Sequence, residues 1–108
     1  MNTSEQTLQQ IERFFNKIFQ KYPETNEENC VLTDIHILVN QDSGEMKAYD
    51  DDEKEITRCV VEQWIDNKDE LFYSYVTDVL RKMLVDKSTD IEKLGILKPY
   101  SFVLEDDD

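Results

Sequence analysis

The chain of 108 residues is poor in the residues that build cofactor sites, with two glycines, two prolines, two cysteines and one histidine. Loops that hold phosphate groups need several closely spaced glycines, whereas Gly44 and Gly95 lie far apart, so a nucleotide-dependent fold is poorly supported. A zinc site needs about four nitrogen or sulfur ligands at short paired spacings, and His36, Cys30 and Cys59 do not supply them. The sequence therefore predicts no cofactor and no bound metal.

Targeting and membrane signals are also lacking. Residues 1–10 contain neither a basic cluster nor an apolar run, and no stretch approaches the roughly 18 apolar residues that a membrane-spanning helix requires. Two cysteines without a signal sequence are typical of reduced thiols rather than of a disulfide. We therefore expect a cytoplasmic protein that does not bind membranes.

Positive charge is scarce, because 12 lysines and arginines stand against 25 acidic residues and leave a net charge of −13. Contacts with phosphate groups depend on clustered lysine and arginine, so direct binding to nucleic acid is unfavourable. The same net charge repels an anionic membrane surface. It favours fast association with a basic protein, which is the kind of partner we expect.

Apolar residues make up 39% of the chain, enough for a hydrophobic core, and the length suits a single domain over residues 1–108. The N-terminal segment predicts an amphipathic helix that ends before Pro23, with a capping box formed by Thr3 and Gln6. The apolar positions that recur at helical spacing are Leu8, Ile11, Phe14, Phe15, Ile18, Phe19 and Tyr22.

Residues 31–49 change to an apolar period of two, which is typical of a β-hairpin, and Gly44 suits the left-handed conformation of its loop. If residues 41–44 form the loop, the apolar faces of the two strands coincide. The predicted opposite pairs are Val39 with Met46, Leu38 with Lys47, Ile37 with Ala48 and His36 with Tyr49.

Two helices are expected next. One begins after the acidic run 50–53 and carries Ile56, Val60 and Trp64 on one side. Asn67, three residues before Glu70, is the expected cap of the other. The apolar positions of this later helix cover more than half of its circumference, which predicts a central helix or one that also meets a partner. These positions are Leu71, Phe72, Tyr75, Val76, Val79, Leu80, Met83 and Leu84.

The C-terminal segment predicts one helical turn over residues 88–95 and then an edge strand, because Tyr100, Phe102 and Leu104 alternate after Pro99. Together the elements predict an α+β fold in which a small, mainly antiparallel sheet packs against three helices. The sheet consists of the hairpin 31–49 and the C-terminal edge strand. The expected order is helix, strand, strand, helix, helix, short helix, strand.

Acidic residues are concentrated in residues 24–34, 42–55 and 105–108. The start of the helix expected after residue 53 explains about three of the middle group, since negative charge is favoured at a helix N-terminus. The acidic tail 105–108 caps no helix, so it either guards the edge strand or contacts a basic partner. The candidate partner-binding residues are Asp50, Asp51, Asp52, Glu53, Glu105, Asp106, Asp107 and Asp108, with Tyr73 at the margin of its helical stripe.

No catalytic residue is assigned, and we expect a protein that is not an enzyme. Nucleophilic catalysis needs a serine or cysteine beside a general base, and no spacing brings such a residue to His36, the only histidine. The alternative is a small hydrolase or isomerase that uses His36, Tyr49 and a nearby carboxylate such as Asp34 inside a cleft.

The leading hypothesis is a non-enzymatic binding module that docks a basic partner protein through its acidic surface. A sharper version is a nucleic-acid mimic, an inhibitor or immunity-type protein whose carboxylates are spaced like phosphates and occupy a basic cleft. A third alternative is a structural or chaperone-like homodimer that buries surplus apolar surface of the first or third helix.

Overall fold

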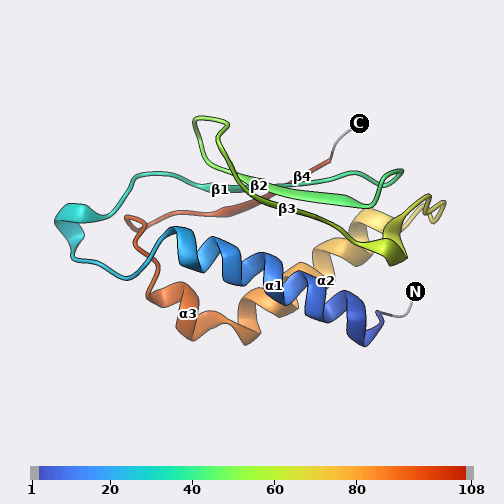
Figure 1. Ribbon diagram of the computed structural model, residues 1–108, viewed down its shortest axis with the longest axis horizontal. Helices are drawn as coiled ribbons and strands as arrows, with labels where there is room; N and C mark the ends of the chain where they lie inside the picture. Colours follow the sequence, from blue (N-terminus) through green and yellow to red (C-terminus); the bar gives the residue numbers. More distant parts are fainter. Residues whose placement is uncertain (1–2, 107–108) are drawn as a thin grey trace.

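A four-stranded sheet and three α-helices make up the protein, whose computed structural model describes residues 3–106 (Figure 1). The helices lie together on one face of the sheet (Figure 1). The predicted α+β class is therefore confirmed. The elements are α1 (Glu5–Lys21), the 3₁₀ helix η1 (Glu27–Asn29), β1 (Ile35–Val39), β2 (Glu45–Tyr49), β3 (Glu55–Val60), the 3₁₀ helix η2 (Glu62–Trp64), α2 (Phe72–Asp86), α3 (Ser88–Glu92) and β4 (Phe102–Asp106).

The sheet is mixed, with the strand order β3-β2-β1-β4. The pairs β1 with β2 and β2 with β3 are antiparallel, whereas β1 and β4 are parallel. The predicted C-terminal strand is confirmed and lies at an edge. Its parallel pairing follows from the path of the chain, because residues 61–101 cross below the sheet through α2 and α3 before β4 begins (Figure 1).

The hairpin of β1 and β2 has the predicted register, with His36 opposite Tyr49 and Ile37 opposite Ala48. Its loop places Gly44 at φ 72°, the left-handed region that glycine enters without steric strain. The Asn40 carbonyl accepts the Gly44 N–H at 2.9 Å. The regular strand begins later than predicted, at Ile35 rather than at residue 31.

The helix predicted after residue 53 is wrong, because residues 55–60 form β3. Ile56, Val60 and Trp64 have helical spacing, but the segment is rich in β-branched side chains that favour a strand beside β2. Trp64 lies beyond the strand in η2 and is fully buried. The acidic run 50–53 therefore forms the turn between β2 and β3 and caps no helix.

Two predicted helix caps are also wrong. Ser4, not Thr3, caps α1, since its Oγ accepts the Thr7 N–H at 3.1 Å. Asn67 does not cap α2, which begins at Phe72, and its side chain instead accepts the Asp69 N–H at 2.8 Å. The N-cap position of α2 is occupied by Leu71, which supplies no side-chain hydrogen bond.

The core lies between the sheet and the helices. One face of each central strand points into it, and the last predicted helical turn, now α3, closes the layer near Leu94 and Ile96. Ring contacts join α1 to the edge strand, since the Phe15 and Phe102 centroids lie 6.0 Å apart. Within residues 3–106, no helix has both the length and the apolar character needed to cross a membrane. Core residues with no exposed surface include Ile11, Phe15, Ile18, Ile35, Val39, Met46, Ala48, Val61, Trp64, Phe72 and Val76.

Candidate functional site

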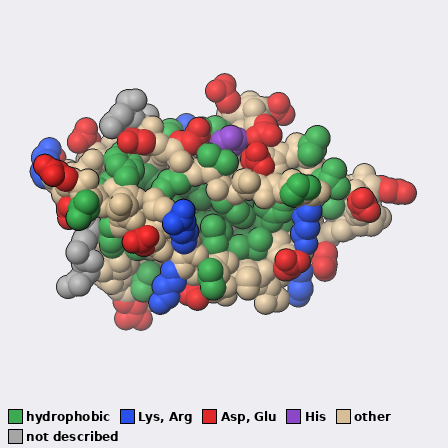
Figure 2. All heavy atoms as spheres, turned by 180° about the vertical axis from the view of Figure 1, so that it is seen from behind, with side chains coloured by type: hydrophobic (Ala, Val, Ile, Leu, Met, Phe, Trp, Pro, Cys, Tyr) green, Lys and Arg blue, Asp and Glu red, His purple; other side chains and the backbone are tan. Residues whose placement is uncertain are grey.

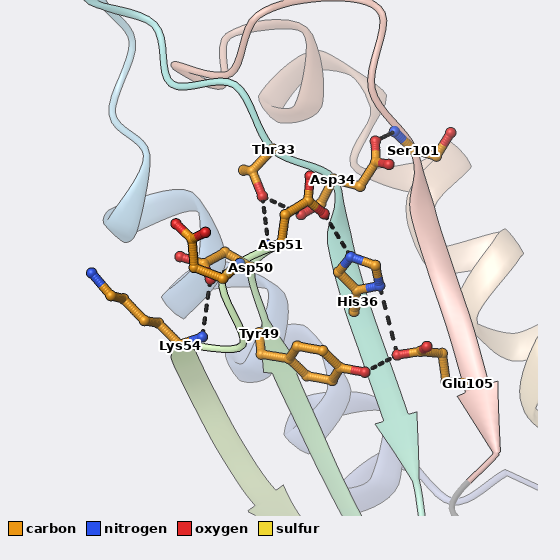
Figure 3. A network of polar contacts seen from close by, with 10 residues as sticks. Thr33, Asp34, His36, Tyr49, Asp50, Asp51, Lys54, Ser101 and Glu105 are labelled. Atoms are coloured by element: carbon orange, nitrogen blue, oxygen red, sulfur yellow. Dashed lines mark hydrogen bonds and ion pairs between the residues drawn. The ribbon is translucent and has the colours of Figure 1, made fainter.

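A cluster of polar side chains lies on the face of the sheet opposite the helices, and we call it the His36 cluster: His36, Tyr49, Asp51 and Glu105 (Figure 3). His36 comes from β1, Tyr49 from β2, Asp51 from the turn between β2 and β3, and Glu105 from β4. Two segments that are distant from each other in sequence, residues 49–51 and the end of β4, therefore converge on the single histidine.

Both ring nitrogens of His36 face carboxylates. Nε2 donates a hydrogen bond to Asp51 Oδ1 at 2.7 Å. Nδ1 is buried, makes no hydrogen bond within residues 3–106, and lies 3.6 Å from Glu105 Oε1, beyond hydrogen-bond range. The hydrogen bond from His36 holds the pKa of the Asp51 carboxyl below its ordinary value of 3.8. Asp51 is therefore an anion over the whole neutral pH range.

Tyr49 packs against His36 within the cluster. Its ring stacks on the His36 ring with centroids 5.1 Å apart and planes 12° from parallel. Its hydroxyl donates a hydrogen bond to Glu105 Oε1, and this bond raises the pKa of Tyr49 to about 12. The Tyr49 hydroxyl thus positions the Glu105 carboxylate at the end of β4, with the imidazole of His36 beside it.

The turn that carries Asp51 is held by local hydrogen bonds. The Asp50 carbonyl accepts the Glu53 N–H at 3.0 Å. Asp50 Oδ1 accepts the N–H groups of Asp52 and Lys54, each at 2.9 Å. Glu53 adopts φ 63°, a left-handed conformation that is unusual for a residue with a Cβ atom. Asp50 is therefore a structural residue of the turn, whereas the side chains of Asp52 and Glu53 are exposed at its tip.

Two further contacts tie the cluster to the sheet. The Asp51 N–H donates to Thr33 Oγ1 at 2.9 Å, and the Thr33 hydroxyl in turn donates to the Asp34 carbonyl. Asp34 Oδ1 accepts the Ser101 N–H at 2.8 Å, which joins the start of β1 to the start of β4. These bonds position the turn over β1 and position β4 alongside it (Figure 3).

The carboxylates of the cluster are open to solvent while the histidine is mostly covered. The side chains of Asp51 and Glu105 are 52% and 38% exposed, against 21% for His36. Figure 2 shows acidic side chains on both sides of the histidine along the sheet side of the molecule. Exposed, fixed carboxylates of this kind attract a cationic group of another molecule.

The nearby cations only partly offset this negative charge. Lys47 lies over the Tyr49 ring, with Nζ 5.6 Å from its centroid. Arg58 on β3 is already engaged by carboxylates, since it forms ion pairs with Glu55 and Glu45. The hydrogen bond with Arg58 lowers the pKa of the Glu55 carboxyl.

The structure brings together some of the predicted partner-binding residues and separates others. Asp51 and Glu105 meet at His36, with Asp52 and Glu53 at the turn tip and Asp106 exposed after Glu105. Asp107 and Asp108 lie outside the described residues. Within the acidic segment 24–34, η1 lies at one end of the molecule, beyond the turn 50–53 (Figure 1), whereas Thr33 accepts the Asp51 N–H and Asp34 lies at the start of β1.

Tyr73, the remaining candidate, lies in the helix layer and not in the cluster. Its side chain is partly buried on α2, packs edge-on against Phe72 and donates to the Val39 carbonyl at 3.4 Å. The structure therefore gives Tyr73 a packing role within the fold.

The carboxylate beside His36 is not the one that the catalytic alternative names. Asp34, the predicted carboxylate partner of His36, binds Ser101 instead, and Asp51 takes its place. A general base needs a ring nitrogen directed at a substrate, whereas both nitrogens of His36 face carboxylates. Over residues 3–106, no group of three or more histidine, cysteine or acidic side chains is arranged to hold a metal ion.

Sequence reasoning missed Thr33, which anchors the turn, and it missed the contact of His36 with both acidic segments. Residues 100–104 indicate a strand but not which strand it joins, so the approach of Glu105 to His36 had no sequence signal. Comparisons of the chain with protein-family models, with characterised proteins and with solved structures found no match.

Proposed function

We propose that the protein is a non-enzymatic binding module that docks a basic partner protein through an acidic site made of Asp51, Asp52, Glu53, Glu105 and Asp106. The observation that carries this proposal is the convergence of two distant acidic segments on His36 (Figure 3). The carboxylates of an acidic site attract lysine and arginine side chains and accelerate encounter with a basic surface.

The His36 cluster supports recognition because it fixes the carboxylates before a partner arrives. Asp51 is held by His36, and Glu105 is held by Tyr49, so less side-chain freedom is lost on binding. Both side chains remain partly exposed to solvent, and a carboxylate accepts hydrogen bonds from lysine and arginine side chains. The cluster therefore acts as a rigid support for an anionic surface.

A nucleic-acid mimic remains an alternative form of the same proposal. A mimic requires a long row of carboxylates spaced like phosphates. This alternative rests on the same residues of the acidic site. The acids of residues 24–28 lie beyond the turn 50–53 at one end of the molecule and outside the His36 cluster, which favours a compact cationic patch as the target (Figure 1). We also propose a cytoplasmic setting, which is supported by the free thiols of Cys30 and Cys59.

The test is a titration of the ¹⁵N-labelled protein with a peptide of about seven lysines, followed by NMR at low salt. The wild type is compared with a site variant and a control variant. The site variant combines Asp52→Asn, Glu53→Gln, Glu105→Gln and Asp106→Asn. The control variant combines Glu24→Gln, Glu27→Gln, Glu28→Gln and Glu70→Gln. Each variant changes the net charge from −13 by +4 to −9, so only the position of the lost charge differs.

We expect the peptide to shift the amide signals of residues 50–54 and 103–106 in the wild type and in the control. The site variant should bind at least about fourfold more weakly, since each of the four exposed charges contributes about 0.2–1 kcal/mol. Equal weakening in both variants, or shifts that are strongest at residues 24–28, would contradict the proposal.

A further inference from the structure

The edge strand β4 leaves one side of its backbone unpaired within residues 3–106, because the sheet ends there. The Ile35 N–H donates to the Ser101 carbonyl at 2.9 Å, so the backbone groups of Ser101 face β1. Successive residues of a strand direct these groups to opposite sides. The N–H and C=O groups of Phe102 and Leu104 therefore point away from β1, toward the open edge.

An apolar groove lies beside this edge, between β4 and α2. It encloses about 160 Å³ and is lined mainly by Leu80, Leu84, Phe102 and Leu104. A second hollow shares Leu84 and Phe102 and continues toward α3. Figure 2 shows apolar side chains in the hollowed centre of this face. The groove thus runs along the helix side of the open strand edge.

Charge is distributed differently on the two faces of β4. On the helix side, Arg81 lines the groove among apolar neighbours. On the opposite side, Val103 pairs with His36, and Glu105 lies at the His36 cluster. A strand added beside β4 would therefore have one face against the apolar groove and Arg81. Its other face would lie beside Glu105. Its basic side chains would be repelled by Arg81 and attracted by Glu105.

We propose that the basic partner contributes an extended segment that adds as a fifth strand to the open edge of β4. This inference rests on the proposed function and names the form of the partner: apolar and basic residues alternate along the segment. The apolar side chains enter the groove beside Leu84, and the basic side chains lie beside Glu105. Strand addition of this kind gains affinity from main-chain hydrogen bonds and specificity from alternate side-chain pockets.

A second copy of the chain fits this edge less well. Each molecule carries a net charge of −13, and β4 is followed directly by further acids up to Asp108. Antiparallel self-pairing centred on Leu104 leaves the two Glu105 carboxylates about two residues apart across the strands, where like charges are destabilising. A basic strand removes this repulsion, so the acidic end of β4 selects against self-pairing and for a basic partner.

The test uses the full-length ¹⁵N-labelled protein and three peptides of about seven residues, capped at both ends. In the first, lysine and valine alternate. In the second, the same residues stand in two blocks. The third is all lysine. We expect the alternating peptide to bind at least about tenfold more tightly than the block peptide, because only alternation turns every valine toward the helix side of the strand edge, where the groove lies. It should also slow amide exchange at Phe102 and Leu104.

The outcomes separate this inference from the proposed function. If the three peptides bind equally and shift only residues 50–54 and 105, acidic docking stands and strand addition is wrong. If none of them shifts these residues, the proposed function itself fails. The amide exchange of Phe102 and Leu104 is also measured without peptide at several protein concentrations. If it becomes slower as the protein concentration rises, a second copy of the chain is the occupant and the proposal is overturned.

A matched pair of variants tests the groove. Leu84→Lys places a cation among the apolar groove residues and should weaken the alternating peptide about tenfold while leaving the all-lysine peptide within about twofold. Leu71→Lys is the control, since Leu71 is 70% exposed before α2 and does not line the groove. Circular dichroism checks that both variants fold. Equal affinity of the two variants for the alternating peptide would contradict a groove-bound strand.

Discussion

The imidazole of His36 and the carboxylate of Asp51 are joined by a 2.7 Å hydrogen bond that ties the turn between β2 and β3 to β1. The bond does two things at once. It fixes the turn over the open face of the sheet, and it keeps Asp51 ionised, because it lowers the pKa of that carboxyl.

Asp51→Asn should reduce stability at neutral pH and lose its effect in acid. A carboxyl whose pKa is lowered in the folded state stabilises the fold above its ordinary pKa of 3.8 and stops doing so as pH falls through the folded value. Urea unfolding at about pH 7 and at a series of lower pH values measures the difference between wild type and variant. Asp52→Asn is the control, since it removes the same charge without touching His36. A difference that does not decline as the pH falls below 3.8 would contradict the assignment.

Tyr49→Phe should lower the free energy of unfolding by about 1 kcal/mol at neutral pH, since it removes the hydrogen bond to Glu105. The raised pKa of Tyr49, about 12, means that this stabilisation is complete below the ordinary value of 10 and is lost as pH rises through 12. NMR titration of the tyrosine rings reports it directly. Glu105→Gln should move the pKa of Tyr49 back toward 10, and an unchanged pKa would exclude Glu105 as its cause.

Glu53→Gly should stabilise the protein. Glu53 has φ 63°, and a left-handed conformation costs a residue with a Cβ atom about 1–2 kcal/mol. Part of the gain is offset because glycine adds entropy to the unfolded chain, so we expect a net increase of about 0.5–1 kcal/mol. Asp52→Gly removes the same charge at a position without a positive φ and should destabilise. Equal effects of the two substitutions in urea unfolding would show that charge, and not backbone conformation, decides the outcome.

Gly44→Ala should destabilise the protein by about 1–3 kcal/mol. The residue has φ 72°, and an added Cβ atom would lie 2.7 Å from the Val61 carbonyl oxygen. Asp42→Ala, an exposed change in the same loop, is the control and should stay within about 0.5 kcal/mol of wild type. Urea unfolding measures both. A neutral Gly44→Ala would mean that the loop shifts to relieve the contact.

Local features of this fold are readable from the sequence. The opposition of His36 and Tyr49 follows from strand alternation and from one glycine in the loop, since a hairpin is specified by neighbouring residues. The strand β3 was misread as a helix because Ile56, Val60 and Trp64 satisfy helical spacing as well. Only pairing with β2 decides between the two periods, and that information is not local.

The residues of the acidic site can be identified from the sequence, but their arrangement in space cannot. The runs 50–53 and 105–108 stand out as acidic, but about three acids of the middle group are assigned to a helix start, and the place where the two runs meet has no sequence signal. Tyr49 and Glu105 are 56 positions apart, and their contact depends on the parallel pairing of β4 with β1. Long-range strand pairing of this kind leaves no trace in periodicity, so the cluster emerges only from the folded chain.

Co-precipitation from an extract of the source cells tests the central claim most directly. The wild type, the site variant and the control variant of equal net charge serve as baits at low and at high salt. We predict that wild type and control retain the same basic protein at low salt, that the site variant does not, and that high salt releases it. If the two variants with a net charge of −9 retain the same proteins in the same amounts, the acidic site around His36 is not the docking surface.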